Sequence, residues 1–199
     1  MKKITILDYG VGNIESLKLF FKSIGYESLL TNKKNIIENS DIVVLPGIGA
    51  FPIAIKNMKK NGLFDSIIQF SKTDKPIIGI CLGMQLLATK SFEFEETEGL
   101  NLIPGEILPI NKNEYQIGWS QIITNRIDER LWYSPDDTFY FNHSYYYKGS
   151  KNLVNACTDN KAKFPAIIVN RNIFGIQFHP EKSQESGKNL MINLLNTFK

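Results

Sequence analysis

The sequence has few of the features that mark exported, membrane-spanning or cofactor-binding proteins. Its 199 residues contain no apolar run of about 18, the length that a helix needs to cross a bilayer. The basic start, Lys2 and Lys3, precedes an apolar run that stops at Asp8, and no small-residue cleavage site follows, as a secretory signal would require. We therefore expect a soluble protein of the cytoplasm.

Cysteine and histidine are equally scarce, with two of each. Cys81 and Cys157 suffice for one disulfide, but the missing export signal favours free thiols in a reducing compartment. His143 lacks the spaced Cys, His or Asp neighbours of a metal site, so a structural or substrate-lining role is the better interpretation. The sequence predicts neither a metal nor another cofactor.

An excess of charge of one sign is also missing. The formal net charge is +3, and the lysines are scattered, with short runs such as Lys59-Lys60. A protein that tracks nucleic acid carries a basic stripe, so we expect no nucleic-acid partner, and no segment indicates a membrane partner. The acidic segment 92–99 is interpreted as a solvated loop.

The length and the pattern predict one α/β domain over residues 1–199, because a chain of this size buries roughly 70% of its unfolded surface. In the first half, short apolar runs alternate with segments of helical period, which is typical of a parallel sheet covered by helices. The expected strands are 3–8, 27–30, 42–45 and 76–80. The expected helices are 14–24, capped by Asn13 and ended by Gly25, then 51–73 with an interruption at Asn61-Gly62, and about 83–88.

The second half is rich in strands. Short connections between them favour antiparallel pairing. The expected strands are 106–110, 116–123, 138–143, 153–157, 166–169 and 173–178, followed by a closing helix with an apolar stripe of Leu190, Met191, Leu194, Leu195 and Phe198. Cys157 falls within one of these strands, where we expect inert packing.

The strongest functional signal is Gly79-Ile80-Cys81-Leu82-Gly83, which has the small-x-nucleophile-x-small pattern of a nucleophile elbow. A nucleophile on a sharp turn from strand to helix has close neighbours, so the flanking glycines remove side chains that would collide. Cys81 is then expected to project into solvent at a helix N-terminus, which favours the thiolate and holds an oxyanion. The alternative is a small buried hydrophobic residue, but the glycine bracket favours the nucleophile.

A thiol nucleophile needs a base, and His179 is the better placed of the two histidines. It ends an apolar strand and precedes Pro180, which holds it in an extended conformation, and Glu181 follows. Imidazole and carboxylate can thus face one cleft, with Glu181 orienting His179 as the third member of a triad. Alone, such a turn is most often structural; beside the cysteine elbow, catalysis is the favoured interpretation.

Two glycine-rich turns follow strands. The segment Pro46-Gly47-Ile48-Gly49-Ala50 lets backbone N–H groups approach a ligand, which fits an oxyanion-hole loop, although an ordinary turn into a helix explains it equally. The segment Gly10-Val11-Gly12-Asn13-Ile14-Glu15 is similar to a dinucleotide-binding fingerprint, but Glu15 occupies the place of the third glycine. We interpret it as a turn between strand and helix.

Segments 79–85 and 177–183 resemble the two motifs of the triad-type, or class I, glutamine amidotransferases, and the two are specific when found together. Matches at 8–13, 46–51, 118–119 and 143–145 extend the resemblance over nearly the whole chain, to the glutaminase subunits of imidazole glycerol phosphate synthases. The resemblance implies a three-layer fold, with a central, mostly parallel sheet, flanking helices and an antiparallel, strand-rich second half.

The resemblance also implies a reaction. Glutamine is the expected substrate, and Cys81 attacks its side-chain amide while His179 moves protons and Glu181 orients His179. Ammonia leaves, and water then releases glutamate. The residues implied to hold the oxyanion or the glutamine are Gly47, Ile48, Gly49, Leu82, Gln85, His143, Ser144 and Tyr145. The implied heterodimer partner is a (β/α)₈ synthase, which joins the ammonia to a phosphoribulosyl formimino intermediate and yields imidazole glycerol phosphate plus an aminoimidazole nucleotide.

The chain departs from the family pattern at Tyr115-Gln116 and Ser120, where the family has Pro-His and Asn, and Asn142 is also unusual. These residues are candidates to face the partner, so alternatives for the acceptor stay open. One alternative is a paralogous subunit that supplies ammonia for surface-sugar biosynthesis. Two further alternatives are a pseudo-glutaminase, which only binds a partner or glutamine, and a cysteine peptidase or isomerase with a similar elbow.

Overall fold

The parallel strands of the first half lie next to one another at one end of a large sheet, as their continuous apolar sequences predict for a parallel arrangement. The computed structural model describes residues 2–11, 14–110 and 115–198. Within them the large sheet has nine strands, in the order β2-β1-β3-β4-β13-β12-β11-β8-β9. The parallel part consists of β1 (Ile4–Leu7), β2 (Ser28–Thr31), β3 (Ile42–Leu45), β4 (Ile77–Ile80) and β13 (Ile173–Ile176).

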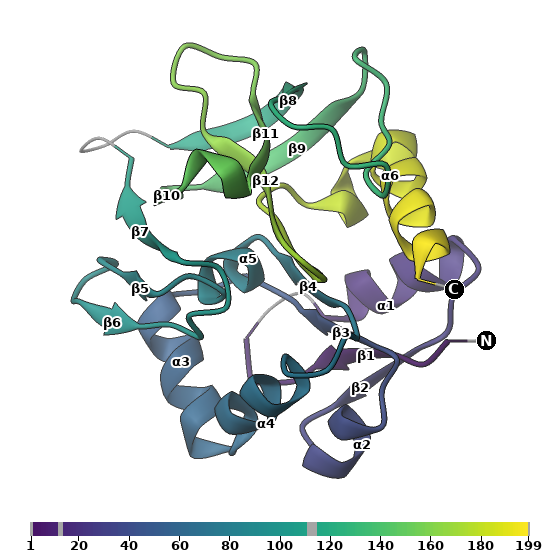
Figure 1. The fold of residues 1–199 in the computed structure, drawn as a ribbon, viewed down its shortest axis with the longest axis vertical. Coiled ribbons are helices and arrows are strands. Elements are labelled where there is room, and N and C mark those ends of the chain that lie inside the picture. The colour runs from purple at the N-terminus through teal and green to yellow at the C-terminus, as the bar shows by residue number, and fades with distance from the viewer. Residues whose placement is uncertain (1, 12–13, 111–114, 199) are drawn as a thin grey trace.

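The second half extends this sheet by antiparallel pairing, which confirms the prediction from its short connections (Figure 1). The strands are β8 (Gln116–Thr124), β9 (Thr138–His143), β11 (Val154–Thr158) and β12 (Pro165–Asn170). Because β13 pairs in parallel with β4 and antiparallel with β12, it joins the two halves. The ends of β4 and β13, which precede Cys81 and His179, therefore lie side by side.

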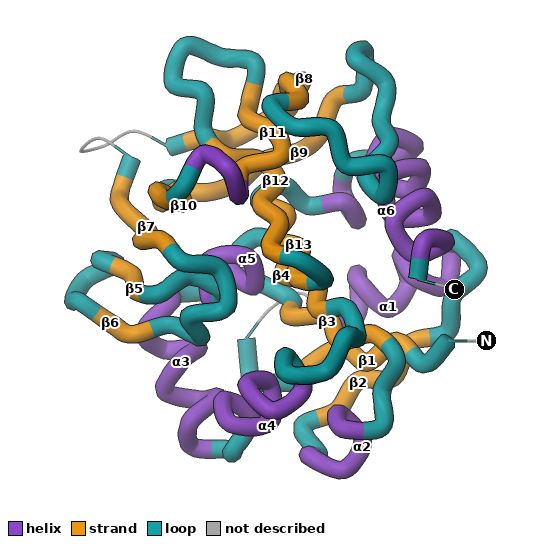
Figure 2. The backbone as a smooth tube through the Cα atoms, viewed as in Figure 1, coloured by secondary structure: helices purple, strands orange, loops and turns teal. Residues whose placement is uncertain are grey.

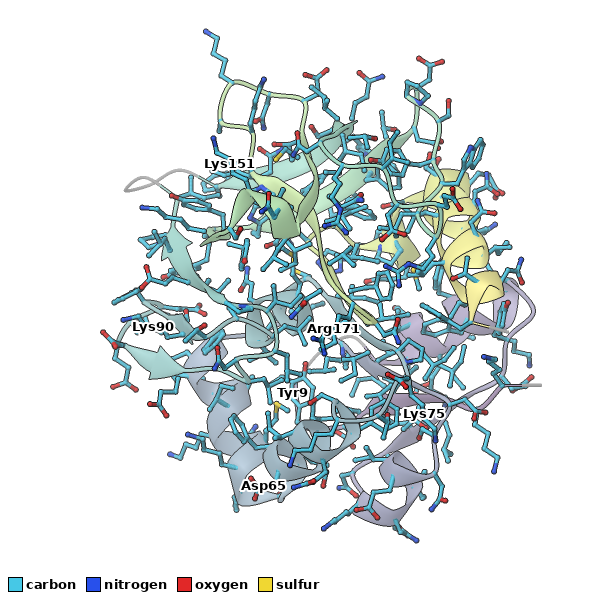
Figure 3. The ribbon with its side chains drawn as sticks, viewed as in Figure 1. Tyr9, Asp65, Lys75, Lys90, Lys151 and Arg171 are labelled. Atoms are coloured by element: carbon cyan, nitrogen blue, oxygen red, sulfur yellow. The ribbon has the colours of Figure 1, made fainter. Side chains whose placement is uncertain are left out.

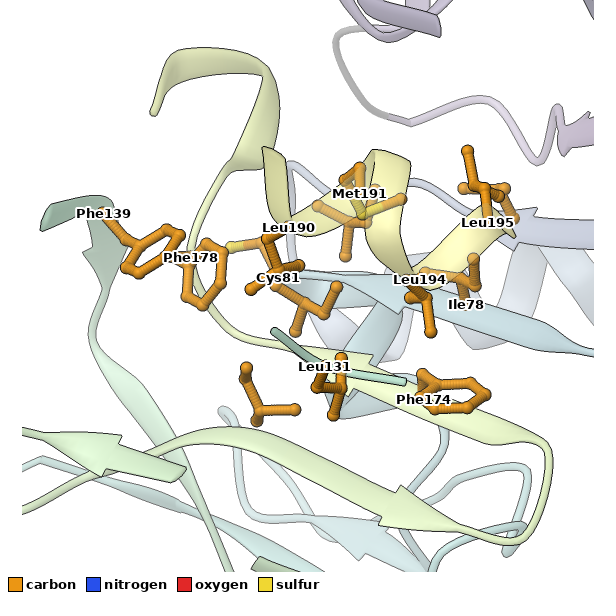
Figure 4. Close-up of a cluster of buried hydrophobic side chains, with 14 of the residues drawn as sticks. Ile78, Cys81, Leu131, Phe139, Phe174, Phe178, Leu190, Met191, Leu194 and Leu195 are labelled. Atoms are coloured by element: carbon orange, nitrogen blue, oxygen red, sulfur yellow. The ribbon is translucent and has the colours of Figure 1, made fainter. Parts of the chain in front are cut away.

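Helices cover both faces of the large sheet (Figure 2). In β3 the side chains alternate, with Ile42 and Val44 in one core cluster and Val43 and Leu45 in the other. The first cluster, part of which Figure 4 shows, includes α1 (Ile14–Ser23) and α6 (Gln184–Thr197). The second includes α3 (Phe51–Lys60), α4 (Leu63–Phe70) and α5 (Leu82–Leu86). This is the expected three-layer arrangement.

The helix boundaries test the predicted caps and breaks. The interruption at Asn61-Gly62 is confirmed, because α3 ends at Lys60 and α4 begins at Leu63. Gly25 has a φ of +84° and follows α1, where Tyr26 N donates to Phe21 O at 2.9 Å, as in a Schellman cap. The predicted N-cap, Asn13, lies outside the described residues. The short helix α2 (Lys34–Glu38) was not predicted.

A second, smaller sheet has four strands. Its order is β10-β7-β5-β6, with β5 (Lys90–Ser91), β6 (Thr97–Glu98), β7 (Gly105–Pro109) and β10 (Tyr145–Gly149). The acidic segment 92–99 forms the turn after β5 and continues through β6, and Glu95, Glu96 and Glu98 are exposed, as expected of a solvated loop. Phe94 at its tip is 82% exposed, but Glu93 is only 8% exposed.

None of the helices in the described ranges combines the length and the apolar character that a membrane span requires. The 3₁₀ turns η1 (Lys151–Leu153) and η2 (Pro180–Lys182) complete the described secondary structure. His179, the residue before η2, holds the segment after β13 against β9, because its N–H donates to Tyr140 O at 2.8 Å.

Candidate active site

Cys81 occupies a strained turn between β4 and α5. Its φ of 51° and ψ of −109° lie where non-glycine residues are rare, and its N–H donates to Ile176 O at 2.7 Å. The prediction of a strand-to-helix elbow is therefore confirmed in its geometry. The expectation that the thiol projects into solvent is wrong, because Cys81 is 7% exposed and belongs to the first core cluster (Figure 4). Its sulfur faces an enclosed pocket instead of the open surface.

The glycines beside Cys81 are required by close backbone contacts. A Cβ atom on Gly79 would lie 2.4 Å from Gly83 O, and one on Gly83 would lie 2.0 Å from Leu45 O. Both distances are far shorter than a van der Waals contact, so neither position accepts a side chain without movement of the backbone. The predicted collision is thus the physical reason for the glycine bracket.

His179 and Glu181 form a fixed pair behind the thiol. His179 Nδ1 lies 2.8 Å from Glu181 Oε1, and both side chains are almost fully buried. Ser183 Oγ donates to His179 O at 2.6 Å, which further fixes the turn. Because Nδ1 faces the carboxylate, Nε2 is left to act on Cys81, which lines the same pocket as His179. The cysteine, the histidine and the glutamate are thus brought together at one site.

The charge state of His179 follows from these contacts. Burial lowers the pKa of the imidazole, but hydrogen bonds to Cys81 and Glu181, together with their negative charges, raise its pKa to about 10. The imidazolium is consequently favoured near neutral pH. A cation next to the sulfur suits a nucleophilic thiolate and places a proton donor beside a leaving group.

A pocket of about 190 Å³ opens in front of Cys81 and His179. Its lining contains every residue that the sequence proposed for this site except Glu181, which lies behind His179. The lining residues are Gly47, Ile48, Gly49, Cys81, Leu82, Gln85, Glu93, Asn142, His143, Ser144, Tyr145 and His179. Two of them, Glu93 and Asn142, were not among the predicted site residues.

The loop 46–50 lies directly against the start of α5. A Cβ atom on Gly47 would be 2.4 Å from Gly83 N and 2.5 Å from Leu82 N, so the two backbones are in the closest contact that glycine permits. Gly49 has a φ of +132°, which L side chains rarely adopt. The backbones of the two segments therefore meet in the pocket that Cys81 lines, where the donors of an oxyanion hole are needed.

Gln85 and Gln177 form a buried polar layer under the pocket. Gln85 Nε2 donates to Tyr145 O at 3.2 Å and to Gln177 Oε1 at 3.3 Å. Gln177 Nε2 lies 3.8 Å from Cys81 Sγ, within reach of a weak hydrogen bond to sulfur. Gln177 opens the motif 177–183 but was not among the predicted site residues. Its position two residues before His179, at the end of the same strand, could have indicated that it lies near the active site.

His143 is a neutral base inside the pocket wall. Its Nδ1 lies 2.9 Å from Tyr145 O, and burial lowers the pKa of the imidazole to about 4. The neutral ring therefore donates from Nδ1, which leaves Nε2 as an acceptor. Within the described residues this buried Nε2 has no hydrogen-bond partner. This geometry suits the substrate-lining role expected from the sequence.

Among the described residues, Glu93 supplies a carboxylate to the pocket lining. Its Oε2 accepts a hydrogen bond from Phe51 N, the first residue of α3, at 2.7 Å. Burial raises the pKa of Glu93, whereas the bond from Phe51 lowers it. A carboxylate in a small pocket is suited to a ligand with an ammonium group. Sequence reasoning missed Glu93 because it lies among other acidic residues, and the expected surface loop concealed its inward direction.

Cys157 lies apart from this pocket. It is half-buried on β11, and Asn125 Nδ2 lies 3.0 Å from its sulfur. Burial raises the pKa of its thiol, which disfavours the reactive thiolate. The prediction of inert packing fits these surroundings.

Comparison with known proteins places the chain among enzymes of one type. A family model described as glutamine amidotransferase class-I matches residues 5–196. The chain is 40% identical over 195 residues to the imidazole glycerol phosphate synthase subunit HisH of Lactococcus lactis, covering 96% of each. It is 41% identical over 192 residues to the subunit of the same name from Carboxydothermus hydrogenoformans, covering 95% of this chain and 96% of the relative.

Solved structures agree with the fold class predicted from the sequence. The PurLQS structure from Thermotoga maritima aligns over 100% of both chains with a TM-score of 0.79 at 19% identity. A glutamine amidotransferase from the same organism aligns over 99% of this chain and 97% of its own, with a TM-score of 0.69 at 15% identity. At such identities the likeness concerns the fold alone.

Proposed function

Because the chain belongs to the class-I glutamine amidotransferases, we propose that it is the glutamine-hydrolysing subunit of an imidazole glycerol phosphate synthase in histidine biosynthesis. One observation carries the chemistry. Cys81, on a turn with φ 51°, lines one pocket with a histidine whose Nδ1 lies 2.8 Å from a buried carboxylate. That arrangement supplies a nucleophile, a proton carrier and an orienting group in one pocket.

The proposed reaction has two halves. The sulfur of Cys81 forms a bond to the side-chain amide carbon of glutamine, and His179 gives its proton to the departing nitrogen, so that ammonia leaves and a thioester remains. His179 then takes a proton from water, which attacks the thioester. Glutamate is released, and this step restores Cys81 and His179 to their starting states for another cycle. Glu181 keeps the imidazole in place and stabilises its charge in both halves.

The oxyanion of each tetrahedral intermediate needs donors close to Cys81. We assign this role to N–H groups of Leu82 and of the loop 46–50, because these backbones meet beside the sulfur. Removal of one such donor lowers kcat by about 10²–10³ in enzymes of this chemistry. The loop conformation is therefore a sensitive control point for the rate.

Recognition of glutamine is assigned to the far side of the pocket. Glu93 is placed to bind the α-ammonium group, which distinguishes a free amino acid from a glutamine residue in a peptide. Gln85, His143, Ser144 and Tyr145 line the path between Glu93 and Cys81. The volume of about 190 Å³ suits a ligand of the size of a small amino acid.

Replacing Glu93 with glutamine is expected to raise the KM for glutamine about tenfold or more while kcat changes little. The charge that attracts the ammonium group is lost, but the amide still accepts a hydrogen bond from Phe51 N. Steady-state ammonia release measures both constants. Glu95→Gln on the exposed tip of the same hairpin is the matched control and should leave both within about twofold. An unchanged KM in Glu93→Gln would contradict the recognition role.

The proposed docking face for the synthase partner adjoins the pocket. On the outer side of β8 and β9, Ile117 is 56% exposed and Trp119 is 48% exposed. Trp119 packs edge-to-face on Tyr140 with ring centroids 5.9 Å apart, and Ile117 pairs with Asn142, which lines the pocket. An apolar face continuous with an ammonia-producing site suits a barrel subunit that consumes ammonia, since docking there shields the product from solvent.

We expect this (β/α)₈ partner to raise kcat by about 10²–10³-fold, by turning a donor of the loop 46–50 toward the oxyanion. In Trp119→Ser, half-maximal activation should need about tenfold more partner, because exposed tryptophans are frequent interface hot spots. Titration of the partner against ammonia release measures this. Trp132, 60% exposed on the separate loop between β8 and β9, provides the control Trp132→Ser, which should shift the titration by less than about twofold.

A direct assay decides between the proposal and its alternatives. Ammonia release from glutamine is measured beside cleavage of unlabelled peptides, with the barrel partner present. Turnover of glutamine supports the proposal, and cleavage of peptides alone would favour a peptidase. Binding of glutamine without turnover would indicate a pseudo-glutaminase.

A further inference from the structure

Tyr9 belongs to the segment that connects β1 to α1 in the sequence, and its side chain lies in the interior of the molecule (Figure 3). It is 0% exposed and packs in the second core cluster, and its hydroxyl donates to Pro46 O, the carbonyl at the start of the loop 46–50. Tyr9 is not among the residues that line the pocket. We propose that Tyr9 is a positioning residue that sets the direction of the Gly47 N–H group through the Pro46 carbonyl.

The reason is the planarity of the peptide bond. The carbonyl of Pro46 and the N–H of Gly47 belong to one peptide unit, in which they point in opposite directions. A hydrogen bond that fixes the carbonyl therefore fixes the N–H as well. Pro46 O points to Tyr9 on the core side, so the Gly47 N–H points away from it, and Gly47 lines the pocket beside Cys81.

The remaining contacts make the tether firm. Asn57 Nδ2 on α3 donates to Tyr9 O at 3.0 Å, so the backbone of Tyr9 is fixed as well as its ring. At the other end of the loop, Glu93 holds Phe51 N at 2.7 Å. Between these two anchors Ile48 is 44% exposed and Gly49 has a φ of +132°. Motion of the loop is thus confined to the segment 47–50.

The phenol is a permanent donor in this place. Burial, and to a lesser extent the charge of Cys81, raise the pKa of Tyr9 far above its ordinary value, so its proton stays on the oxygen throughout the pH range of the enzyme.

The inference rests on the proposed glutaminase function and is tested with Tyr9→Phe in the full chain at saturating partner. This variant keeps the ring and removes the hydrogen bond to Pro46 O. Tyr147→Phe is the matched control, because Tyr147 is also 0% exposed and its hydroxyl donates to a proline carbonyl, Pro104 O, at 2.6 Å. Both variants leave one buried carbonyl without its donor, so similar losses in Tm are expected.

Tyr9→Phe should lower kcat about tenfold or more with the KM for glutamine within about twofold, whereas Tyr147→Phe should leave kcat within about twofold. A second readout is alkylation of Cys81 by chloroacetamide, which forms no oxyanion and should be equally fast in all three proteins. Equal kcat in the two variants, or a parallel loss of alkylation in Tyr9→Phe, would overturn the inference and spare the glutaminase function. A wild-type chain that turns over no glutamine would overturn both.

Discussion

Replacing Cys81 with alanine is expected to abolish glutaminase activity, by roughly 10⁴-fold or more, because no other group in the pocket can form the thioester. Cys157→Ala is the matched control and should leave the activity within about twofold, since Cys157 lies on β11 outside the pocket. Ammonia release under saturating glutamine measures both variants.

A covalent label gives an independent measure of the same assignment. A glutamine analogue with a reactive side chain should attach to Cys81, because Cys81 lines the pocket together with His179. Peptide mapping locates the label. Equal activity losses in the two cysteine variants, or attachment to Cys157, would refute the assignment of the nucleophile.

The second large effect concerns the order of importance within the triad. His179→Asn should reduce kcat by about 10³-fold or more, because the proton carrier is lost. Glu181→Gln should reduce kcat less. In the wild type the Glu181 carboxylate lies 2.8 Å from Nδ1, and the amide of the variant still contacts this nitrogen but cannot stabilise the imidazolium charge. Steady-state kinetics of both variants and of the double variant measure these effects.

The double variant is the sharper test, because residues that act as a unit are not additive. Once His179 is absent, Glu181 has no imidazole to orient. The loss in the double variant should then be close to that of His179→Asn alone. Losses that multiplied in full would exclude Glu181 as the orienting residue.

Local signals explain why so much of the site was predictable from the sequence. The glycines around Cys81 are required by contacts of 2.4 Å and 2.0 Å to neighbouring backbone, so the pattern of residues records the geometry directly. His179 and Glu181 are separated by one proline, and a turn of three residues leaves few ways to place their side chains. Each of these features lies within a few residues of chain.

Features that depend on distant packing were missed. Glu93 faces the pocket because Phe51, 42 residues earlier, offers an N–H to its carboxylate, and nothing near Glu93 in the sequence indicates this bond. Gln177 reaches Gln85 across 92 residues. The helix α2 has no side-chain cap and buries one residue, Ile37, so its apolar pattern is too short to recognise.

The expected strand 138–143 coincides with β9, whereas β10 was not predicted, for the same reason. Residues 138–149 are strand-like throughout, but β9 pairs with β8 in the large sheet and β10 pairs with β7 in the small one. The chain crosses from one sheet to the other at Ser144, which lines the pocket. Only the choice of partner strands, which the local sequence does not contain, determines this crossing.

The position of Glu93 has a thermodynamic consequence. One carboxylate both holds the N–H at the end of the loop 46–50 and faces the pocket in which the amino acid is proposed to bind. Occupancy of the pocket and the conformational equilibrium of the loop are then linked functions, and the linkage is reciprocal. A synthase subunit that shifts the loop toward its active conformation must change the equilibrium affinity for glutamine by the same factor by which glutamine changes the affinity of the two subunits for each other.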